Sequence, residues 1–206
     1  MKYFIWTILG YLAGSVLYAC LLPLRFKHID ICAVSDDHNP GAANAFKYAG
    51  FFTGLCVIIC ELLKAFLPVF IAARRVDADR LPFAFIMAAP VIGHAFSVFY
   101  KGKGGKAIAA SFGVLLALFP NLYPFASLAV FYILFSTVFI ITPHLHRSIV
   151  TFLLFALSLF MLDLNPATRL GGCLIAGITI YKHLKSYSGE AFRLQFLNTK
   201  AQKRRT

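Results

Sequence analysis

The sequence predicts an all-α integral membrane protein with about seven transmembrane helices. First, 60% of its 206 residues are hydrophobic and 14% are charged, whereas about one quarter of a soluble domain is charged. If the chain folded as a soluble domain, much of this apolar surface would remain in contact with water. Second, the charged residues stand between long apolar runs rather than among them. These observations exclude a disordered, fibrous or small disulfide-rich secreted protein.

The apolar runs predict the helices in order, because roughly 20 apolar residues are needed to cross the hydrocarbon core. Three runs contain no Asp, Glu, Lys or Arg, and the third is long enough for two helices that break at Pro120-Asn121. Two shorter stretches are interpreted as helices that tilt or locally thin the bilayer. The predicted helices are residues 5–24, 51–73, 81–100, two within 107–142, 149–162 and 170–181.

The positive charges predict the orientation of the chain, whose net charge is +12. When the loops alternate between two sides, fourteen of the 20 Lys and Arg residues fall on one side and five on the other. Loops rich in Lys and Arg tend to stay in the cytoplasm. We therefore expect an external N-terminus, a cytoplasmic C-terminus and a basic cytoplasmic tail over residues 191–206, with residues 1–206 forming one membrane-embedded domain. Because the excess charge is confined to loops, nucleic acid is not an expected partner.

The five cysteines lie mostly in apolar segments and show no CxxC spacing. We therefore expect free thiols. Cys56 and Cys60 stand one helical turn apart and could bind a metal, but small residues facing lipid or a neighbouring helix are the favoured interpretation. We predict neither a metal nor a cofactor.

The clearest functional signal is the segment Lys-Gly-Lys-Gly-Gly-Lys at residues 101–106, directly before a predicted helix. Glycines let backbone N–H groups approach an anion, a helix N-terminus adds partial positive charge, and lysines add full charges. This chemistry suits a phosphate, although the spacing is not that of a Walker loop. The alternative is a basic loop that only touches anionic lipid headgroups. His94, a short way upstream, could face the same cavity or serve as a hydrogen-bonded packing residue.

The first cytoplasmic loop places Asp36, Asp37 and His38 before the turn signal Asn39-Pro40-Gly41. Two carboxylates beside an imidazole could bind a divalent metal. They could also form a solvated loop that caps a helix, which is the favoured interpretation.

Glu61 and Lys64 are the charged residues of the helix predicted over residues 51–73. Because they are three residues apart, they lie on one helix face and can pair. Charges inside the membrane are candidates for function. An internal pair that locks helices together is an equally good interpretation.

Six segments resemble, in order along the chain, motifs of the PlsY-type acyl-phosphate:glycerol-3-phosphate acyltransferases of bacterial membranes. Residues 93–99, Gly-His-Ala-Phe-Ser-Val-Phe, and residues 103–106, Lys-Gly-Gly-Lys, are similar to the family's G-H-x-F-P-V-F and K-G-G-K-G. Residues 10–16, 39–47, 61–69 and 182–190 resemble Y-L-x-G-S-I, N-x-G-A-T-N-V-x-R, D-x-x-K-G-x-x-P-V, and the terminal R-H-x-x-N with G-x-E. By this collinearity the chain is identified as a divergent member of the family.

The resemblance implies transfer of a fatty acyl group from acyl phosphate to the 1-hydroxyl of glycerol 3-phosphate, giving lysophosphatidate. It implies a multi-pass monomer in the bacterial inner membrane, with the two substrates and membrane lipid as partners. Acyl phosphate is already activated, so positioning and charge stabilisation can carry much of the rate. The implied catalytic residues are His94, Lys103, Lys106 and Lys47, and the implied substrate-binding residues are Asn39, Gly41, Asn44, Gly104, Gly105, Ser148, His183, Ser186 and Glu190.

The chain departs from the family pattern at positions that touch phosphate. Gly-Ser-Gly usually precedes the asparagine of the first loop, where this chain has Asp36, Asp37 and His38. The family's phosphate-binding serine is therefore missing, unless Ser35 replaces it from a shifted position. Elsewhere, Lys47 stands for an arginine and loses its bidentate fork, Ser148 is the one match within residues 144–148 to Y-V-S-L-x-S, and Ser186 stands for an asparagine.

These departures leave two arrangements of the first loop open. If the loop folds inward, His38, or His146 from the neighbouring connection, could donate the hydrogen bond that the family takes from serine. One carboxylate, Asp37 or Asp36, could then orient that imidazole or accept a proton. The favoured arrangement points both aspartates into the cytoplasm, because a carboxylate beside two phosphates is repelled.

The sequence leaves three other functions to compare with this one. The altered loop leaves open an acyltransferase with another phosphorylated acceptor. An acyltransferase of the His-x-x-x-x-Asp type is disfavoured, because no histidine here is followed by Asp at that offset. A non-enzymatic transporter of anionic lipid would place polar residues at the midplane of several helices, where only Glu61 and Lys64 qualify.

Overall fold

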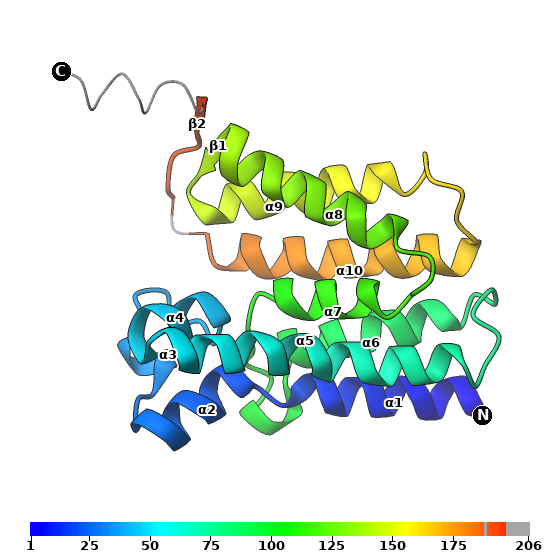
Figure 1. Cartoon of the computed structure of the whole chain (residues 1–206), viewed down its shortest axis with the longest axis horizontal. Coiled ribbons are helices and arrows are strands. Elements are labelled where there is room, and N and C mark those ends of the chain that lie inside the picture. The colour runs from blue at the N-terminus through cyan, green and yellow to red at the C-terminus, as the bar shows by residue number, and fades with distance from the viewer. Residues whose placement is uncertain (188, 197–206) are drawn as a thin grey trace.

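The computed structural model describes residues 1–187 and 189–196, which fold mainly into helices (Figure 1). The helices are α1 (Lys2–Ser15), α2 (Tyr18–Lys27), α3 (Ile31–Val34), α4 (Ala42–Ala49), α5 (Phe51–Ala73), α6 (Phe83–Ala95), α7 (Ile108–Leu116), α8 (Tyr123–Ile133), α9 (His144–Ser158) and α10 (Pro166–Lys185). The remaining elements are the 3-10 turn η1 (Val98–Tyr100), the π-helical turn η2 (Leu134–Val138), β1 (Phe139–Thr142) and β2 (Arg193–Phe196). Each apolar stretch predicted to be helical contains at least one helix.

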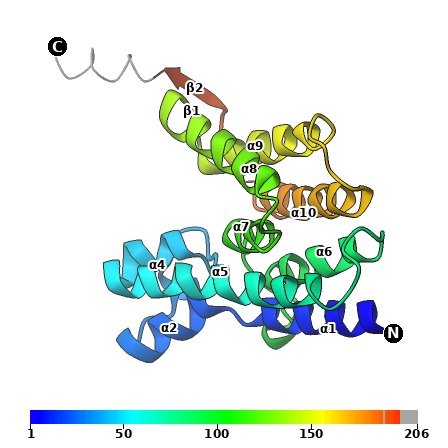
Figure 2. The ribbon, with the colours of Figure 1, turned by 45° about the vertical axis from the view of Figure 1, so that its right-hand side comes forward.

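The helices form two layers with α7 between them. Helices α1, α5 and α6 make one layer and α8, α9 and α10 the other (Figures 1 and 2). Within this arrangement α1 packs on α6, α6 on α10, and α7 on α5. The largest fully buried side chains include Phe83 and Met87 of α6, Leu115 of α7, and Phe152 and Phe155 of α9. The largest side chains of the core therefore lie along α6, α7 and α9, and smaller residues of α5 and α10 pack against them.

Exposed apolar side chains run along the outside of the bundle. On α5, Ile59, Leu63 and Leu67 are 46%, 45% and 48% exposed. Residues four apart share one helix face, so these side chains form a stripe suited to lipid. Among the described residues, three segments are long and apolar enough to cross a membrane: Lys2–Lys27, Phe51–Ala73 and Phe83–Tyr100.

The helix α7 is shorter than the sequence predicted. Its nine residues rise about 14 Å, which is about half the thickness of the hydrocarbon core. It is enclosed by α5, α6, α8 and α10, which all contact it. The structure therefore confirms a helical membrane protein, and the number of seven crossings stays a prediction.

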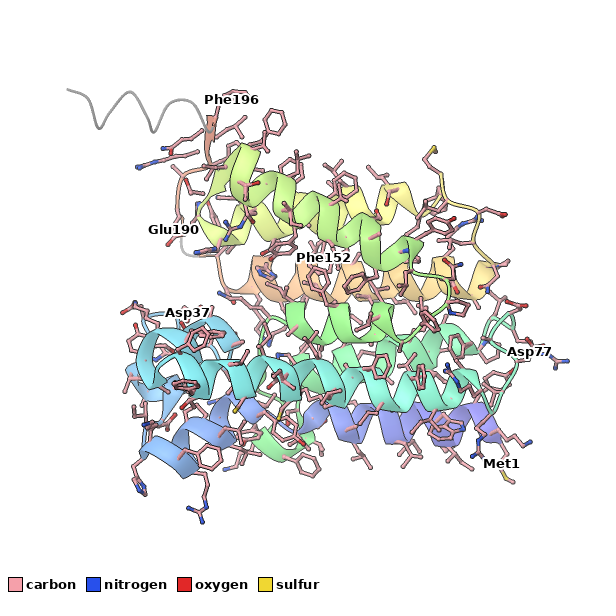
Figure 3. All side chains as sticks on the ribbon, in the orientation of Figure 1. Met1, Asp37, Asp77, Phe152, Glu190 and Phe196 are labelled. Atoms are coloured by element: carbon pink, nitrogen blue, oxygen red, sulfur yellow. The ribbon has the colours of Figure 1, made fainter. Side chains whose placement is uncertain are left out.

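The loops separate into two groups at opposite ends of the bundle. Figure 3 places Met1 and Asp77 at one end and Asp37 and Glu190 at the other. This is the alternation that the charge distribution predicted for the N-terminus and the first, second and last connections. The assignment of the Asp37 end to the cytoplasm stays a prediction from the charges.

The first predicted helix is broken between Ser15 and Tyr18, where α1 ends and α2 begins. The Val16 carbonyl accepts a hydrogen bond from Lys64 Nζ at 2.5 Å, and the Ala19 N–H donates to Glu61 Oε1 at 3.2 Å. A break at membrane depth is tolerated only where other groups satisfy the freed backbone atoms. The two charged residues of α5 supply both partners, so they stabilise the break.

The described chain departs from the all-helical prediction at β1 and β2, which pair antiparallel with Phe139 opposite Phe196 and Thr142 opposite Arg193. Residues 139–142 read Phe-Ile-Ile-Thr, and β-branched and aromatic residues favour strands. This pairing connects the segment after α10 to the start of α9. Part of the predicted tail over residues 191–206 is thus a strand, while residues 197–206 lie outside the described residues.

The close packing of α1 on α6 depends on glycine and gives a first prediction. A Cβ on Gly93 would lie 2.1 Å from the Tyr11 carbonyl oxygen, whereas a Cβ on Gly177 of α10 would meet nothing within 4 Å. We expect Gly93→Ala to lower the free energy of unfolding in detergent by about 1–3 kcal/mol, because the helices must separate. Gly177→Ala, the matched control, should be neutral or stabilise by up to about 1 kcal/mol. Equal unfolding curves for the two variants would contradict this packing.

Candidate active site

A cavity of about 830 Å³ lies between the first loop, α5, α7, α8, α9 and the end of α10. Its polar lining is Asp37, Asn39, Asn44, Lys47, Glu61, His94, Lys106, Tyr132, His144, Ser148 and His183. Its apolar lining includes Ile58 and Leu62 of α5, Ile108, Phe112 and Leu116 of α7, and Phe125 of α8. Polar residues of the first loop, the Gly-Lys segment, α9 and α10 therefore meet at one cavity, which the apolar side chains of α7 also line.

At the base of the cavity, three buried side chains form a hydrogen-bonded group. Glu61 Oε2 lies 2.5 Å from Lys64 Nζ and 2.9 Å from His94 Nδ1. The side chains of Glu61, Lys64 and His94 are 1%, 3% and 5% exposed. Glu61 Oε2 accepts from both Lys64 Nζ and His94 Nδ1, so we assign the Nδ1 proton of His94 to this bond, which leaves Nε2 able to accept. The predicted Glu61–Lys64 pair is confirmed, and it also orients a predicted catalytic residue.

The glycines of the Gly-Lys segment pack against His94. A Cβ on Gly105 would lie 2.3 Å from His94 Nε2, and one on Gly104 would lie 2.1 Å from the His94 carbonyl oxygen. The Gly105 N–H donates to that carbonyl at 3.1 Å. Lys182, which opens the terminal motif but was not among the predicted site residues, donates from Nζ to the carbonyls of Ala95 and Gly104 at 2.9 and 3.1 Å. These glycines are thus required for the loop to lie on the imidazole, and neither lines the cavity.

The lysines of this segment occupy different environments. Lys106 lines the cavity, and its Nζ lies 2.8 Å from Asp37 Oδ2. Lys103 is exposed and is not among the residues that line the cavity. The structure thus brings Lys106, but not Lys103, to the predicted phosphate site.

The side chains of the first loop differ in direction, since one of them lines the cavity and its neighbours do not. Asp37 lines the cavity, whereas Asp36 is 84% exposed and pairs with Lys47 at 2.8 Å. His38 turns away, and its Nδ1 lies 2.8 Å from the Cys32 carbonyl oxygen. Ser35 is buried outside the cavity lining, so it does not take the place of the family serine. The prediction that both aspartates point outward is therefore wrong for Asp37.

Both aspartates are held in the ionised form. Burial opposes the charge of Asp37, but hydrogen bonds from Lys106 and Asn44 outweigh it and hold the pKa of this carboxyl below its ordinary value. Hydrogen bonds from Lys47 and Tyr48 likewise lower the pKa of Asp36, and the Asp36 carboxylate raises the pKa of Lys47. The cavity lysines are therefore paired with carboxylates.

In residues 1–187 and 189–196, no cluster of three His, Cys, Asp or Glu side chains could hold a metal.

The opposite wall of the cavity carries His183, Ser148 and two residues that the sequence did not single out. His183 Nδ1 donates to the Thr179 carbonyl at 2.8 Å, which leaves Nε2 as the acceptor. Ser148 Oγ lies 2.7 Å from the hydroxyl of Tyr132. His144, which was missed, lines the cavity four residues before Ser148 on α9. This i, i+4 spacing is the signal that could have identified it.

Three other predicted site residues lie away from the cavity lining. His146 Nε2 donates to the Glu190 carbonyl at 2.9 Å, and its ring packs against Tyr187 and Phe192. Ser186 Oγ donates to the Lys182 carbonyl at 3.0 Å, and both Ser186 and Glu190 are exposed. Asn39, Gly41 and Asn44, by contrast, line the cavity, and their role in binding substrate stays a prediction.

Comparison with known proteins places this chain in a family. The family model described as "Glycerol-3-phosphate acyltransferase" matches residues 4–189. A glycerol-3-phosphate acyltransferase of Hydrogenobaculum sp. (strain Y04AAS1) is 32% identical over 87% of this chain and 89% of its own length. A glycerol-3-phosphate acyltransferase of Thermotoga petrophila is 36% identical over 57% of this chain and 59% of its own length.

Two crystal structures of PlsY, an integral membrane glycerol 3-phosphate acyltransferase, have a similar fold. The glycerol 3-phosphate form has a TM-score of 0.75 and 27% identity, and covers 90% of each chain. The lysophosphatidic acid form has a TM-score of 0.73 and 26% identity, and covers 90% of this chain and 89% of PlsY. The match over residues 4–189 confirms the resemblance seen in the motifs, and the chain belongs to the glycerol-3-phosphate acyltransferase family.

Proposed function

We propose that the protein transfers a fatty acyl group from acyl phosphate to the 1-hydroxyl of glycerol 3-phosphate, giving lysophosphatidate and inorganic phosphate. The observation that carries this proposal is the composition of the cavity lining. Lys106, Asn44 and His183 stand at its polar end, and the apolar side chains of α7 continue it. A phosphate and a long acyl chain on one substrate need both kinds of surface.

The acyl chain is proposed to lie along α7. Ile108, Phe112 and Leu116 are four residues apart on this helix, so they form one apolar stripe facing the cavity. Leu62 of α5 and Phe125 of α8 complete the channel. The carbonyl carbon would then lie near the start of α7, beside Lys106.

In the proposed reaction the 1-hydroxyl oxygen attacks the carbonyl carbon, and the bond from that carbon to the phosphate oxygen breaks. Lys106 and Asn44 bind a phosphate and stabilise charge as the phosphate departs. His94, held by Glu61, is proposed to take the hydroxyl proton at Nε2. The remaining groups orient the two substrates, since an acyl phosphate needs no covalent nucleophile.

The test is an assay of purified protein with acyl phosphate and glycerol 3-phosphate, reading both inorganic phosphate and lysophosphatidate. We expect equal amounts of the two products. A control without acceptor measures hydrolysis, and other phosphorylated alcohols test for an altered acceptor. Folded protein that forms neither product would refute the proposal.

We further propose a monomer in the bacterial inner membrane with the Asp37 end of the bundle in the cytoplasm. The charge asymmetry of the loops supports this orientation. Lys103, exposed in the Gly-Lys segment, offers a position for a label: Lys103→Cys in intact cells should react slowly with an impermeant maleimide and quickly after permeabilisation. Rapid labelling of intact cells, relative to the unsubstituted protein, would reverse the orientation.

A further inference from the structure

The carboxylate of Asp37 collects the donors that the sequence assigned to a substrate phosphate. Oδ2 accepts from Lys106 Nζ at 2.8 Å, and Oδ1 accepts from Asn44 Nδ2 at 2.8 Å and from the Asn39 N–H at 3.3 Å. Lys106, Asn44 and Asn39 all line the cavity. The Asp37 carboxylate therefore occupies the position in which these donors could bind a phosphate.

We propose that Asp37 occupies the subsite of a substrate phosphate and competes with that phosphate for Lys106 and Asn44, so that Asp37 is a built-in competitor of the substrate. The inference rests on the proposed function in that this subsite binds phosphate. A carboxylate carries one charge and two oxygens, whereas a terminal phosphate carries up to two charges and three oxygens. A phosphate monoester can therefore displace Asp37, and a singly charged ligand displaces it less well.

The surroundings of Asp37 allow this exchange. Its side chain is 43% exposed and stands on the loop before α4, so it can turn towards solvent when an anion arrives. The neighbouring Asp36 and His38 do not line the cavity, which leaves Asp37 as the carboxylate of this loop with access to the subsite. The family pattern has a serine in this stretch, so the competing charge is a property of this chain.

The experiment measures binding of inorganic phosphate to purified protein in detergent by calorimetry, without acyl transfer. Asp37→Asn keeps the shape of the side chain and removes its charge. Lys106 then has no carboxylate partner to give up, and no carboxylate repels the phosphate, so we expect the variant to bind phosphate roughly 3- to 10-fold more tightly. Acetate, the singly charged probe, loses the same competitor and should also bind more tightly, but it should gain less than phosphate, because a nearby carboxylate repels the more highly charged ligand more strongly. Asp77→Asn is the matched control, because Asp77 pairs with Arg80 at the opposite end of the bundle (Figure 3), and it should bind as the unsubstituted protein does.

The coupling to Lys106 separates competition from a general charge effect. In a Lys106→Ala background, Asp37→Asn should improve phosphate binding by much less. Phosphate affinity of Asp37→Asn equal to or below that of Asp77→Asn would overturn the inference, as would an undiminished gain without Lys106. If Asp37→Asn does not fold, Asp37→Ser receives the same test.

The two proposals fail in different ways. Tighter phosphate binding by Asp37→Asn in a protein that makes no lysophosphatidate would refute the proposed function and leave the competition standing. If the protein makes lysophosphatidate and Asp37→Asn leaves its phosphate affinity unchanged, only the competition is refuted.

Discussion

Glu61→Gln is expected to cost about 3–5 kcal/mol of stability, because it leaves the ammonium of Lys64 as a buried charge without its counter-ion. Lys64 Nζ lies 2.5 Å from the Glu61 carboxylate, and both side chains are nearly inaccessible. The Gln amide keeps the size of the side chain, so the effect isolates the charge. Activity should fall as well, since the carboxylate that holds His94 in position is lost.

Two measurements separate these effects. Unfolding in detergent gives the stability, with Asp77→Asn as the control, because its ion pair with Arg80 is largely exposed and should contribute about 0–1 kcal/mol. The value of kcat/KM, taken well below the unfolding temperature, gives the effect on catalysis. A Glu61→Gln variant that unfolds with the control would mean that Lys64 finds its compensation elsewhere, contrary to the proposed arrangement.

The second large effect is expected at Lys106. Lys106→Ala should lower kcat/KM by about 10- to 150-fold, because a hydrogen bond to a charged group contributes about 1.5–3 kcal/mol and each 1.36 kcal/mol is a factor of about ten. Lys106→Arg keeps the charge and should retain more activity than the alanine variant. The measurement is steady-state transfer to glycerol 3-phosphate.

Neighbouring lysines provide the comparison. Lys101 is exposed and does not line the cavity, so Lys101→Ala should stay within about 2-fold of the unsubstituted protein, as a surface change does. Lys103→Ala asks whether this second lysine reaches the substrates, as the motif predicts, or stays in solvent, as its exposure indicates. Equal losses for Lys101→Ala and Lys106→Ala would show that only the overall charge of the loop matters.

Hydropathy predicted the positions of those helices whose bounds depend on the length of an apolar run that faces lipid. The run predicted over residues 51–73 is α5 to the residue, and the predicted break at Pro120-Asn121 falls between α7 and α8. In both cases the information is local, because apolar length and a proline specify the outcome. The break between α1 and α2 was not predictable in this way, since its partners Lys64 and Glu61 are 48 and 42 residues distant from Val16 and Ala19.

The candidate site shows a similar limit. Motif spacing identified Lys106, Asn44, His94 and Ser148, which all line the cavity. The sequence did not distinguish Asp37 from Asp36, because adjacent residues of one type differ only in the backbone turn that aims them. Likewise His146 was chosen and His144 missed, because two residues along a helix reverse the face and the register of α9 was unknown.

The break between α1 and α2 also bears on how the chain enters the membrane. Until α5 arrives, the Val16 carbonyl and the Ala19 N–H have neither Lys64 nor Glu61 as partners. In hydrocarbon these backbone groups would instead hydrogen-bond within the segment, so that residues 2–27 would form one continuous helix. We therefore expect the first segment to insert as a single long helix and to bend only after α5 has been threaded beside it, so that biogenesis passes through a shape that the finished protein no longer has.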